Sequence, residues 1–165
     1  MSFSHYLLRL VPLFALLAFG CAKNEELLPP PNDLTLDGNL FDVTSASIIG
    51  VASNNEGHAG ISLISINNLK TEVLTIDVEY SGNSSVEGVY SFPQAVNDKY
   101  LDDWLTSFSI TDGSTFTSIN LSVGTVNVLN NGGDNYTLLI DLIMVDGSTF
   151  KGSYTGDFIV VFNNG

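Results

Sequence analysis

The sequence predicts an all-β protein with a single antiparallel β-barrel or β-sandwich of about 9–11 short strands, the barrel being preferred. Three observations lead to this fold class. Runs of alternating apolar and polar residues recur from residue 34 to residue 165, clusters of Asp, Asn and Gly separate them, and no stretch carries a helical repeat. A barrel closes its edge strands on themselves whereas a sandwich has to protect them, and the pattern agrees with both.

The clearest strand lies at Thr71–Tyr80, after a predicted hairpin and a loop. The hairpin is expected at Leu34–Val43, because its central Asp37-Gly38 favours the left-handed dihedral angles of tight turns. Ser53–Gly60 is rich in Asn and Gly and is expected to be a loop that carries His58. Within Thr71–Tyr80 the strict alternation predicts two faces: Leu74, Ile76, Val78 and Tyr80 on one, Val73, Thr75, Asp77 and Glu79 on the other.

Nine further strands are expected from similar but weaker patterns. They are Ser47–Val51, Gly60–Ile66, Val86–Phe92, Ser107–Thr111, Thr115–Val123, Thr125–Leu129, Tyr136–Val145, Phe150–Gly156 and Phe158–Phe162. Tyr136–Val145 is largely apolar on both faces, which predicts a central strand. The pentapeptide Asp112-Gly-Ser-Thr-Phe116 recurs as Asp146-Gly-Ser-Thr-Phe150. We interpret both copies as the same kind of hairpin turn, in which Asp and Gly form the turn and Phe enters the core. A ligand-binding repeat is the alternative.

The first twenty residues have the pattern of a secretory signal peptide. Arg9 and no acid precede an apolar run of ten residues, Leu10–Phe19, and small Gly20 stands before Cys21. A membrane-spanning helix needs about 20 apolar residues, so this run is too short to be one. The sequence therefore predicts three parts: a signal peptide at 1–20, a lipidated N-terminus and Pro-rich tether at 21–33, and an all-β domain at 34–165.

Ala18-Phe19-Gly20-Cys21 resembles the lipobox of bacterial lipoproteins, in which the cysteine becomes the first residue and carries acyl chains. The resemblance implies lipidation of Cys21 and membrane attachment through two or more chains, which make an anchor durable. Ala22–Glu26 is similar to the surface-export signal of Bacteroidota lipoproteins, a plain solvated linker being the alternative. Gly124–Phe162, with Lys151–Gly156 after an Asp-Gly turn, resembles the C-terminal hairpins of small uncharacterised lipoproteins of the same group. Together these features imply a protein of the cell outer membrane that faces outward.

The charge of the chain excludes one class of partner. There are 5 basic and 18 acidic residues, and removal of residues 1–20 takes away Arg9, which leaves four basic residues and a net charge of −14. The four lysines are scattered, so there is no basic patch to follow the phosphates of a nucleic acid, and nucleic acid is excluded as a partner. A glycan, a small hydrophobic ligand or a protein partner remains compatible with this charge.

The irregular segment Pro93–Leu105 is the candidate binding loop. It lacks the period of two, and it places Tyr100 and Trp104 beside Asp102 and Asp103. Acidic side chains next to an aromatic platform can bind sugars. The same residues can equally form a solvated loop with Trp104 tucked into the core, and this second interpretation is preferred over a binding site.

Catalytic chemistry has little support in the residue inventory. After cleavage His58 is the one histidine, no Gly-x-Ser-x-Gly elbow exists, and Cys21 is acylated. A zinc site built from three or four His or Cys side chains is not available either. No cofactor is expected, although Asn97-Asp98 with Asp102-Asp103, or Asp134 with Asn135, could contribute to a structural calcium site.

The function expected from these features is that of a non-catalytic binding or interaction module of unknown ligand, anchored in the outer membrane. A structural protein or accessory subunit of an outer-membrane complex is the first alternative. A carbohydrate-active hydrolase that uses Asp102 or Asp103 is the weakest one, because such enzymes need two carboxylates held about 5–10 Å apart.

Overall fold

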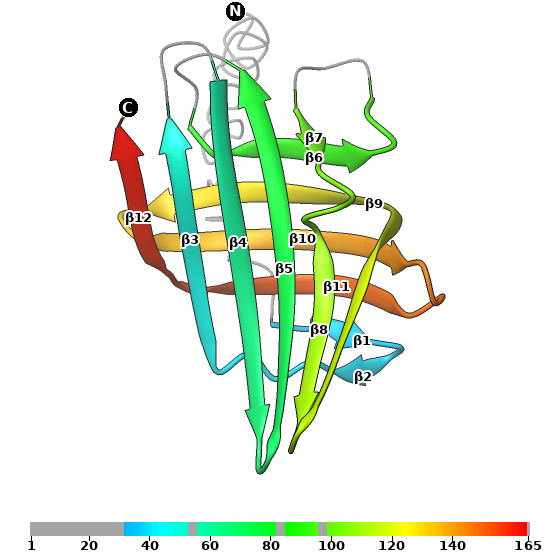
Figure 1. Cartoon of the computed structure of the whole chain (residues 1–165). Helices are drawn as coiled ribbons and strands as arrows, with labels where there is room; N and C mark the ends of the chain where they lie inside the picture. The colour runs from blue at the N-terminus through cyan, green and yellow to red at the C-terminus, as the bar shows by residue number, and fades with distance from the viewer. Residues whose placement is uncertain (1–31, 53–55, 82–84, 96–98, 165) are drawn as a thin grey trace, which may run out of the picture.

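The protein is all-β, as the sequence predicts, over residues 32–52, 56–81, 85–95 and 99–164, which a computed structural model describes (Figure 1). These residues form twelve strands and no helix. The strands are β1 (Thr35–Leu36), β2 (Asn39–Leu40), β3 (Ser45–Ala52), β4 (Glu56–Asn67), β5 (Lys70–Ser81), β6 (Gly88–Phe92), β7 (Tyr100–Leu101), β8 (Ser107–Asp112), β9 (Thr115–Gly132), β10 (Asn135–Met144), β11 (Thr149–Asp157) and β12 (Ile159–Asn164). In this part of the chain there is accordingly no helix that could cross a membrane.

The strands form two layers that cross steeply, and strands of both layers take part in a closed barrel. β12, β3, β4 and β5 run side by side in one layer, and β6, β9, β10 and β11 cross behind them (Figure 1). Pairing continues from β5 to β8, β9, β6 and β7 and returns to β5, so that five strands close on themselves. The pairings β12–β3 and β6–β7 are parallel and the others antiparallel.

β9 joins the two layers, and a glycine allows it to do so. Its first residues, Thr115–Asn120, pair with β8, and its later residues pair with β6 and β10. Gly124 lies where β9 is flanked by both β6 and β10, and a Cβ atom there would stand 2.5 Å from the carbonyl oxygen of Asp141. A side chain would therefore push the strands apart. Gly124 is part of one continuous strand, whereas two separate strands, Thr115–Val123 and Thr125–Leu129, were predicted on either side of it.

One hydrophobic core fills the space enclosed by the two layers and includes the inward side chains of the five barrel strands. The predicted inner face of β5, Leu74, Ile76, Val78 and Tyr80, is buried, and so are the alternating residues Leu138, Ile140, Leu142 and Met144 of β10. Phe150 packs edge to face against Phe108 and Phe41, with ring centroids 5.0 and 5.4 Å apart. β10 lies between β9 and β11, which confirms its predicted central position.

The N-terminal hairpin is attached to β11. Asp37 and Gly38 both have positive φ, as the Asp-Gly turn between β1 and β2 requires. Before it, the Asp33 carboxylate accepts hydrogen bonds from the backbone N–H and the hydroxyl of Ser153, at 2.6 and 2.9 Å. These bonds hold the start of the domain against the sheet.

Two further local predictions differ from the structure. His58 does not lie in a loop, because β4 begins at Glu56, before the Gly60 start that the sequence indicated. The two pentapeptide copies do form hairpin turns, but only Phe150 enters the core, whereas the side chain of Phe116 is 67% exposed. The β8–β9 hairpin extends beyond the barrel, so Phe116 has no opposite layer to pack against (Figure 1).

Candidate functional site

The outer face of β4, β5 and β7 brings titratable side chains together. Strand register sets His58 of β4 opposite Glu79 of β5, and Glu79 opposite Tyr100 of β7. Asp77 lies two residues before Glu79 and therefore projects from the same face. His58, Asp77 and Glu79, the His58 cluster, each offer one ligand atom, and these three atoms lie within 4.8 Å of one another.

The imidazole of His58 lies between the two carboxylates. Its Nε2 is 3.1 Å from Oδ2 of Asp77, and its Nδ1 is 2.7 Å from Oε1 of Glu79. Burial lowers the pKa of His58, but the hydrogen bond to Glu79 and the charges of Asp77, Glu79 and Asp102 outweigh burial, so the pKa is raised overall. The cationic form of His58 is thus favoured, and both ring nitrogens are engaged.

Asp77 is unusual for a residue on an outer face because it is only 5% exposed. Its Oδ1 atom is buried and has no hydrogen-bond partner among the described residues. Burial raises the pKa of Asp77 to about 6, against the charge of His58, with a further rise from the charges of Glu79 and Asp102. A buried carboxylate oxygen without a partner is costly, and such an atom calls for a specific explanation.

The segment that follows β7 holds the backbone of Asp77. The Asp77 N–H donates to Oγ1 of buried Thr106 at 3.0 Å, and the Asp77 carbonyl accepts from the N–H of Asp102 at 3.1 Å. Asp102 in turn accepts the N–H groups of Trp104 and Leu105 through Oδ1, at 2.8 and 2.9 Å. Asp77 therefore occupies a fixed position, whereas His58 and Glu79 are held from more exposed positions.

The predicted loop residues only partly converge on this site. Tyr100 pairs with Glu79, and Asp102 lies close enough to influence the pKa of Asp77 and of His58. Asp103 and Trp104 belong to the turn before β8, and within the described ranges no hydrogen bond or ion pair joins either side chain to the cluster. Trp104 is 80% exposed, so the interpretation that placed it in the core is wrong. Asp102 fixes this turn, and the turn leaves the side chain of Trp104 in solvent.

A hollow lies beside the cluster and shares Glu79 with it. This Tyr100 hollow has a volume of about 410 Å³ and is lined by Glu56, Glu79, Tyr80, Ser81, Gln94 and Tyr100. Burial, together with the charges of Glu79 and Asp102, raises the pKa of the Tyr100 hydroxyl. Tyr100 therefore stays protonated at neutral pH and can donate a hydrogen bond into an acidic surrounding.

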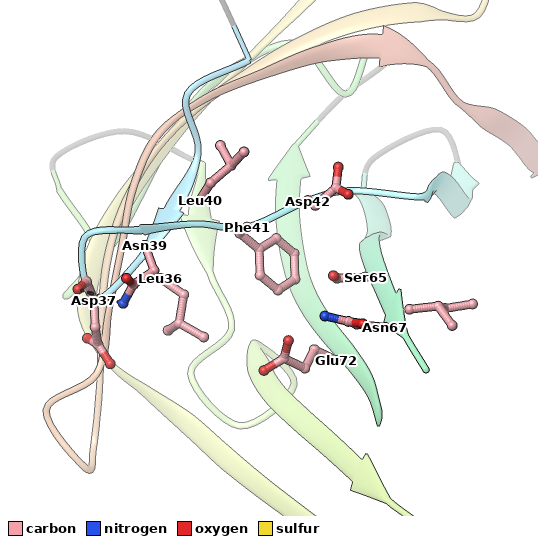
Figure 2. A pocket seen from close by; sticks show the side chains of 10 residues that line it. Leu36, Asp37, Asn39, Leu40, Phe41, Asp42, Ser65, Asn67 and Glu72 are labelled. Atoms are coloured by element: carbon pink, nitrogen blue, oxygen red, sulfur yellow. Dashed lines mark hydrogen bonds between the residues drawn. The ribbon is translucent and has the colours of Figure 1, made fainter. Parts of the chain in front are cut away.

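A second hollow, the Leu36 hollow, lies at the other end of the first layer. It has a volume of about 500 Å³, between the segment Leu36–Asp42 and residues of β4 and β5 (Figure 2). Its acids include Asp37 and Glu72. Asp37 accepts from the N–H of Thr149 at 2.8 Å, and Glu72 pairs with Lys70 at 2.6 Å. Asp37 and Glu72 therefore already have partners, and the third acid of the hollow, Asp42, is exposed to solvent, so we place the candidate site at the His58 cluster.

Sequence reasoning missed this cluster because it counted only His and Cys as zinc ligands and placed His58 in a loop. A usable signal did exist. Asn67 pairs with Lys70 across Asn68-Leu69, and a two-residue turn at that place sets His58 opposite Glu79. The positive φ of Asn68 fits such a turn.

The other predicted sites cannot all be compared with the structure. Cys21, the predicted site of lipidation, and Asn97-Asp98, a predicted contribution to a calcium site, lie outside the described residues. Comparison with protein-family models, with curated proteins and with solved structures found no match for this chain.

Proposed function

We propose that this chain is a non-catalytic binding module, anchored by acyl chains on Cys21 in the outer membrane and facing outward. In this proposal it presents the outer face of β4, β5 and β7 to a neutral, hydroxyl-rich ligand such as a glycan. The observation that carries the proposal is the Tyr100 hollow of about 410 Å³, in which an aromatic ring, two carboxylates and an amide converge. The lipobox-like residues around Cys21 support the anchor.

Two features favour surface binding over carriage of a ligand inside the barrel, and binding over catalysis. The core fills the interior, so space for a ligand lies on the outside. Both nitrogens of His58 already face carboxylates, so the imidazole lacks the free nitrogen that a general base needs. The acids around the hollow disfavour an anionic ligand, which agrees with a neutral one.

A glycan-binding screen with the purified full chain tests the binding part of the proposal. We expect Tyr100→Ala to abolish binding, because the Tyr100 ring lines the hollow and its hydroxyl can donate a hydrogen bond to the ligand. Phe116→Ala removes another exposed aromatic from the β8–β9 hairpin and serves as the matched control. If Tyr100→Ala leaves every detected binding unchanged, the site is wrongly assigned.

The anchor has a separate test. Mass analysis of the mature protein should find acyl chains on Cys21, and Cys21→Ser should release the protein from membranes. A Cys21→Ser protein that stays firmly bound to membranes would refute the anchor and leave the binding face untested by that experiment.

An accessory subunit of an outer-membrane complex is the second candidate, favoured by the outer face of β3 and β12. Four large apolar side chains lie exposed there: Ile49, Val51, Ile159 and Val161. β12 is the last strand in the order, so one of its edges is unpaired among the described residues. This candidate predicts that a partner copurifies after mild detergent extraction and that Val161→Lys removes it, whereas a partner-free monomer counts against it.

A further inference from the structure

The proposed function does not account for Oδ1 of Asp77, which is buried and has no hydrogen-bond partner among the described residues. An ion triad formed only by His58, Asp77 and Glu79 would account for Oδ2 of Asp77, which lies 3.1 Å from His58, but not for Oδ1. Such a triad also leaves negative charge in excess, because Asp102 adds a third carboxylate close by. A divalent cation would satisfy a buried carboxylate and balance the charges of Asp77 and Glu79.

We propose that His58, Asp77 and Glu79 form a binding site for one divalent transition-metal ion of the zinc class. The proposal concerns the face assigned above and rests on that assignment, but it is independent of the lipid anchor. Zinc accepts one imidazole nitrogen and two carboxylate oxygens as ligands, and on binding the ion would displace to solvent the proton that this nitrogen shares with its carboxylate. The imidazole distinguishes this set from the all-oxygen sites that calcium and magnesium prefer.

The geometry allows this site with small side-chain movements. The three ligand atoms lie within 4.8 Å of one another, and ligands bound at about 2.0–2.1 Å around a tetrahedral ion stand roughly 3.4 Å apart. The side chains of His58 and Glu79 are 41% and 25% exposed, so they can move closer until the ligand atoms reach the separation that a tetrahedral ion requires. Thr106 and Asp102 hold the backbone of Asp77, so the adjustment would fall mainly on the side chains of His58 and Glu79.

The surroundings also fit an ion that keeps an open coordination position. Three protein ligands leave a fourth position of a tetrahedral ion for water or for another ligand. Glu79 belongs both to the cluster and to the Tyr100 hollow, so the ion would lie at the margin of that hollow. The inferred metal would thereby bring a cation next to the place where the proposed ligand binds.

Calorimetric titration of the untagged, EDTA-treated full chain in detergent with ZnCl2 tests the inference. We expect one zinc ion per chain, and a separate titration with CaCl2 should show at least 100-fold weaker binding. Asp77→Asn keeps the size of the side chain and should weaken zinc binding at least 100-fold, and His58→Gln at least tenfold. Asp141→Asn, whose carboxylate is exposed and 3.4 Å from Lys151, is the matched control and should leave binding unchanged.

Two controls keep the outcome interpretable. Cys21 can itself bind zinc when it is not acylated, so the Cys21→Ser chain has to retain the zinc ion. Circular dichroism checks that each variant is folded, and His58→Gln, at a more exposed position, gives a second reading if Asp77→Asn does not fold. Absence of zinc binding, equal affinity in a folded Asp77→Asn or His58→Gln, or calcium bound as tightly as zinc would overturn the inference. Loss of zinc binding with unchanged glycan binding would leave the proposed function standing.

Discussion

The His58 cluster and the Leu36 hollow are both acidic, but their carboxylates are held in opposite ways. Around the hollow, Asp37 accepts two hydrogen bonds from Thr149 and Glu72 pairs with Lys70. Just before this hairpin, Asp33 accepts two more from Ser153, which hold its pKa below the usual range. In the cluster, Asp77 is buried, one of its oxygens has no partner in the described part of the chain, and burial raises its pKa to about 6.

The difference shows which acids of a strongly acidic chain deserve a functional interpretation. A carboxylate whose oxygens already accept from backbone or hydroxyl groups fastens one segment to another. A carboxylate that is buried without a full set of partners lowers stability, and a bound ligand can repay that cost. The number of acidic residues near a hollow does not distinguish the two cases, whereas their hydrogen bonds do.

The largest effect is expected from His58→Ala in metal-free buffer. The substitution removes the positively charged partner of Asp77 and leaves a buried carboxylate without it, so the free energy of unfolding should fall by about 1–3 kcal/mol. Urea denaturation in the presence of EDTA measures this. Ser62→Ala, on the same face of β4, should change stability by less than about 0.5 kcal/mol. Equal effects of the two substitutions would mean that His58 does not compensate the charge of Asp77.

Asp102→Ala is expected to have the next largest effect. It removes the acceptor for the N–H groups of Trp104 and Leu105 and loosens the turn that holds the backbone of Asp77. We expect a loss of about 1 kcal/mol in the free energy of unfolding, measured by urea denaturation. Asp102→Asn keeps an acceptor oxygen at the same place and should recover most of this loss. A full loss with Asn would point to the charge of Asp102 rather than to its hydrogen bonds.

The outer position of Asp77 and Glu79 could be predicted from the sequence. The turn at Asn68-Leu69 also carried a signal for their meeting with His58, but the composition of Ser53–Gly60 pointed to a loop there. Alternation along Thr71–Tyr80 gives the faces directly, because successive side chains of a strand point to opposite sides. The predicted start of β4 was wrong because Asn54, Asn55 and Gly57 have the composition of a loop. In the structure the strand extends to Glu56, and Gly57 leaves room for the ring of Tyr80, with which a Cβ atom would collide. Pairing with β3 and β5 across the sheet decides this, and no local pattern contains it.

The strand that closes the barrel, β7, could not be predicted from the sequence either. β7 is only two residues long and lies inside a segment with no period of two, yet its pairing with β5 and β6 closes the barrel and places Tyr100 beside Glu79. The two pentapeptide copies give the same lesson. The same residues occur in hairpin loops of different length, 113–114 between paired Asp112 and Thr115 and 144–148 between paired Ile143 and Thr149. Phe150 is buried and Phe116 is exposed.

Asp33→Asn tests how a carboxylate with hydrogen-bond partners contributes to stability, through the pH dependence of unfolding. Because hydrogen bonds from Ser153 lower the pKa of Asp33 in the folded state, Asp33 stabilises the fold above about pH 4, the pKa of an unfolded aspartate. This contribution is lost as the pH falls through the folded-state value. Urea midpoints between about pH 2 and 6 should therefore fall less steeply with acid in Asp33→Asn than in the unmodified chain.

Ser153→Ala is the matched control for this pH dependence. It removes one of the two donors to Asp33 and should flatten the acid slope in the same direction but by less, because the backbone N–H of Ser153 remains. An unchanged slope in Asp33→Asn would show that other carboxylates cause the acid sensitivity of the fold.

The smallest effect is expected from Glu72→Gln, at the Leu36 hollow. Glu72 pairs with a lysine that is 44% exposed, and such pairs contribute little because water and salt screen both charges. We expect a change of less than about 0.5 kcal/mol in urea denaturation and no change in zinc affinity. The substitution removes an acid from a hollow of about 500 Å³, whereas His58→Ala leaves every acid of its cluster in place. If Glu72→Gln nevertheless cost as much as His58→Ala, burial of the carboxylate would not be what separates the two regions, and the case for a ligand at Asp77 would lose its physical basis.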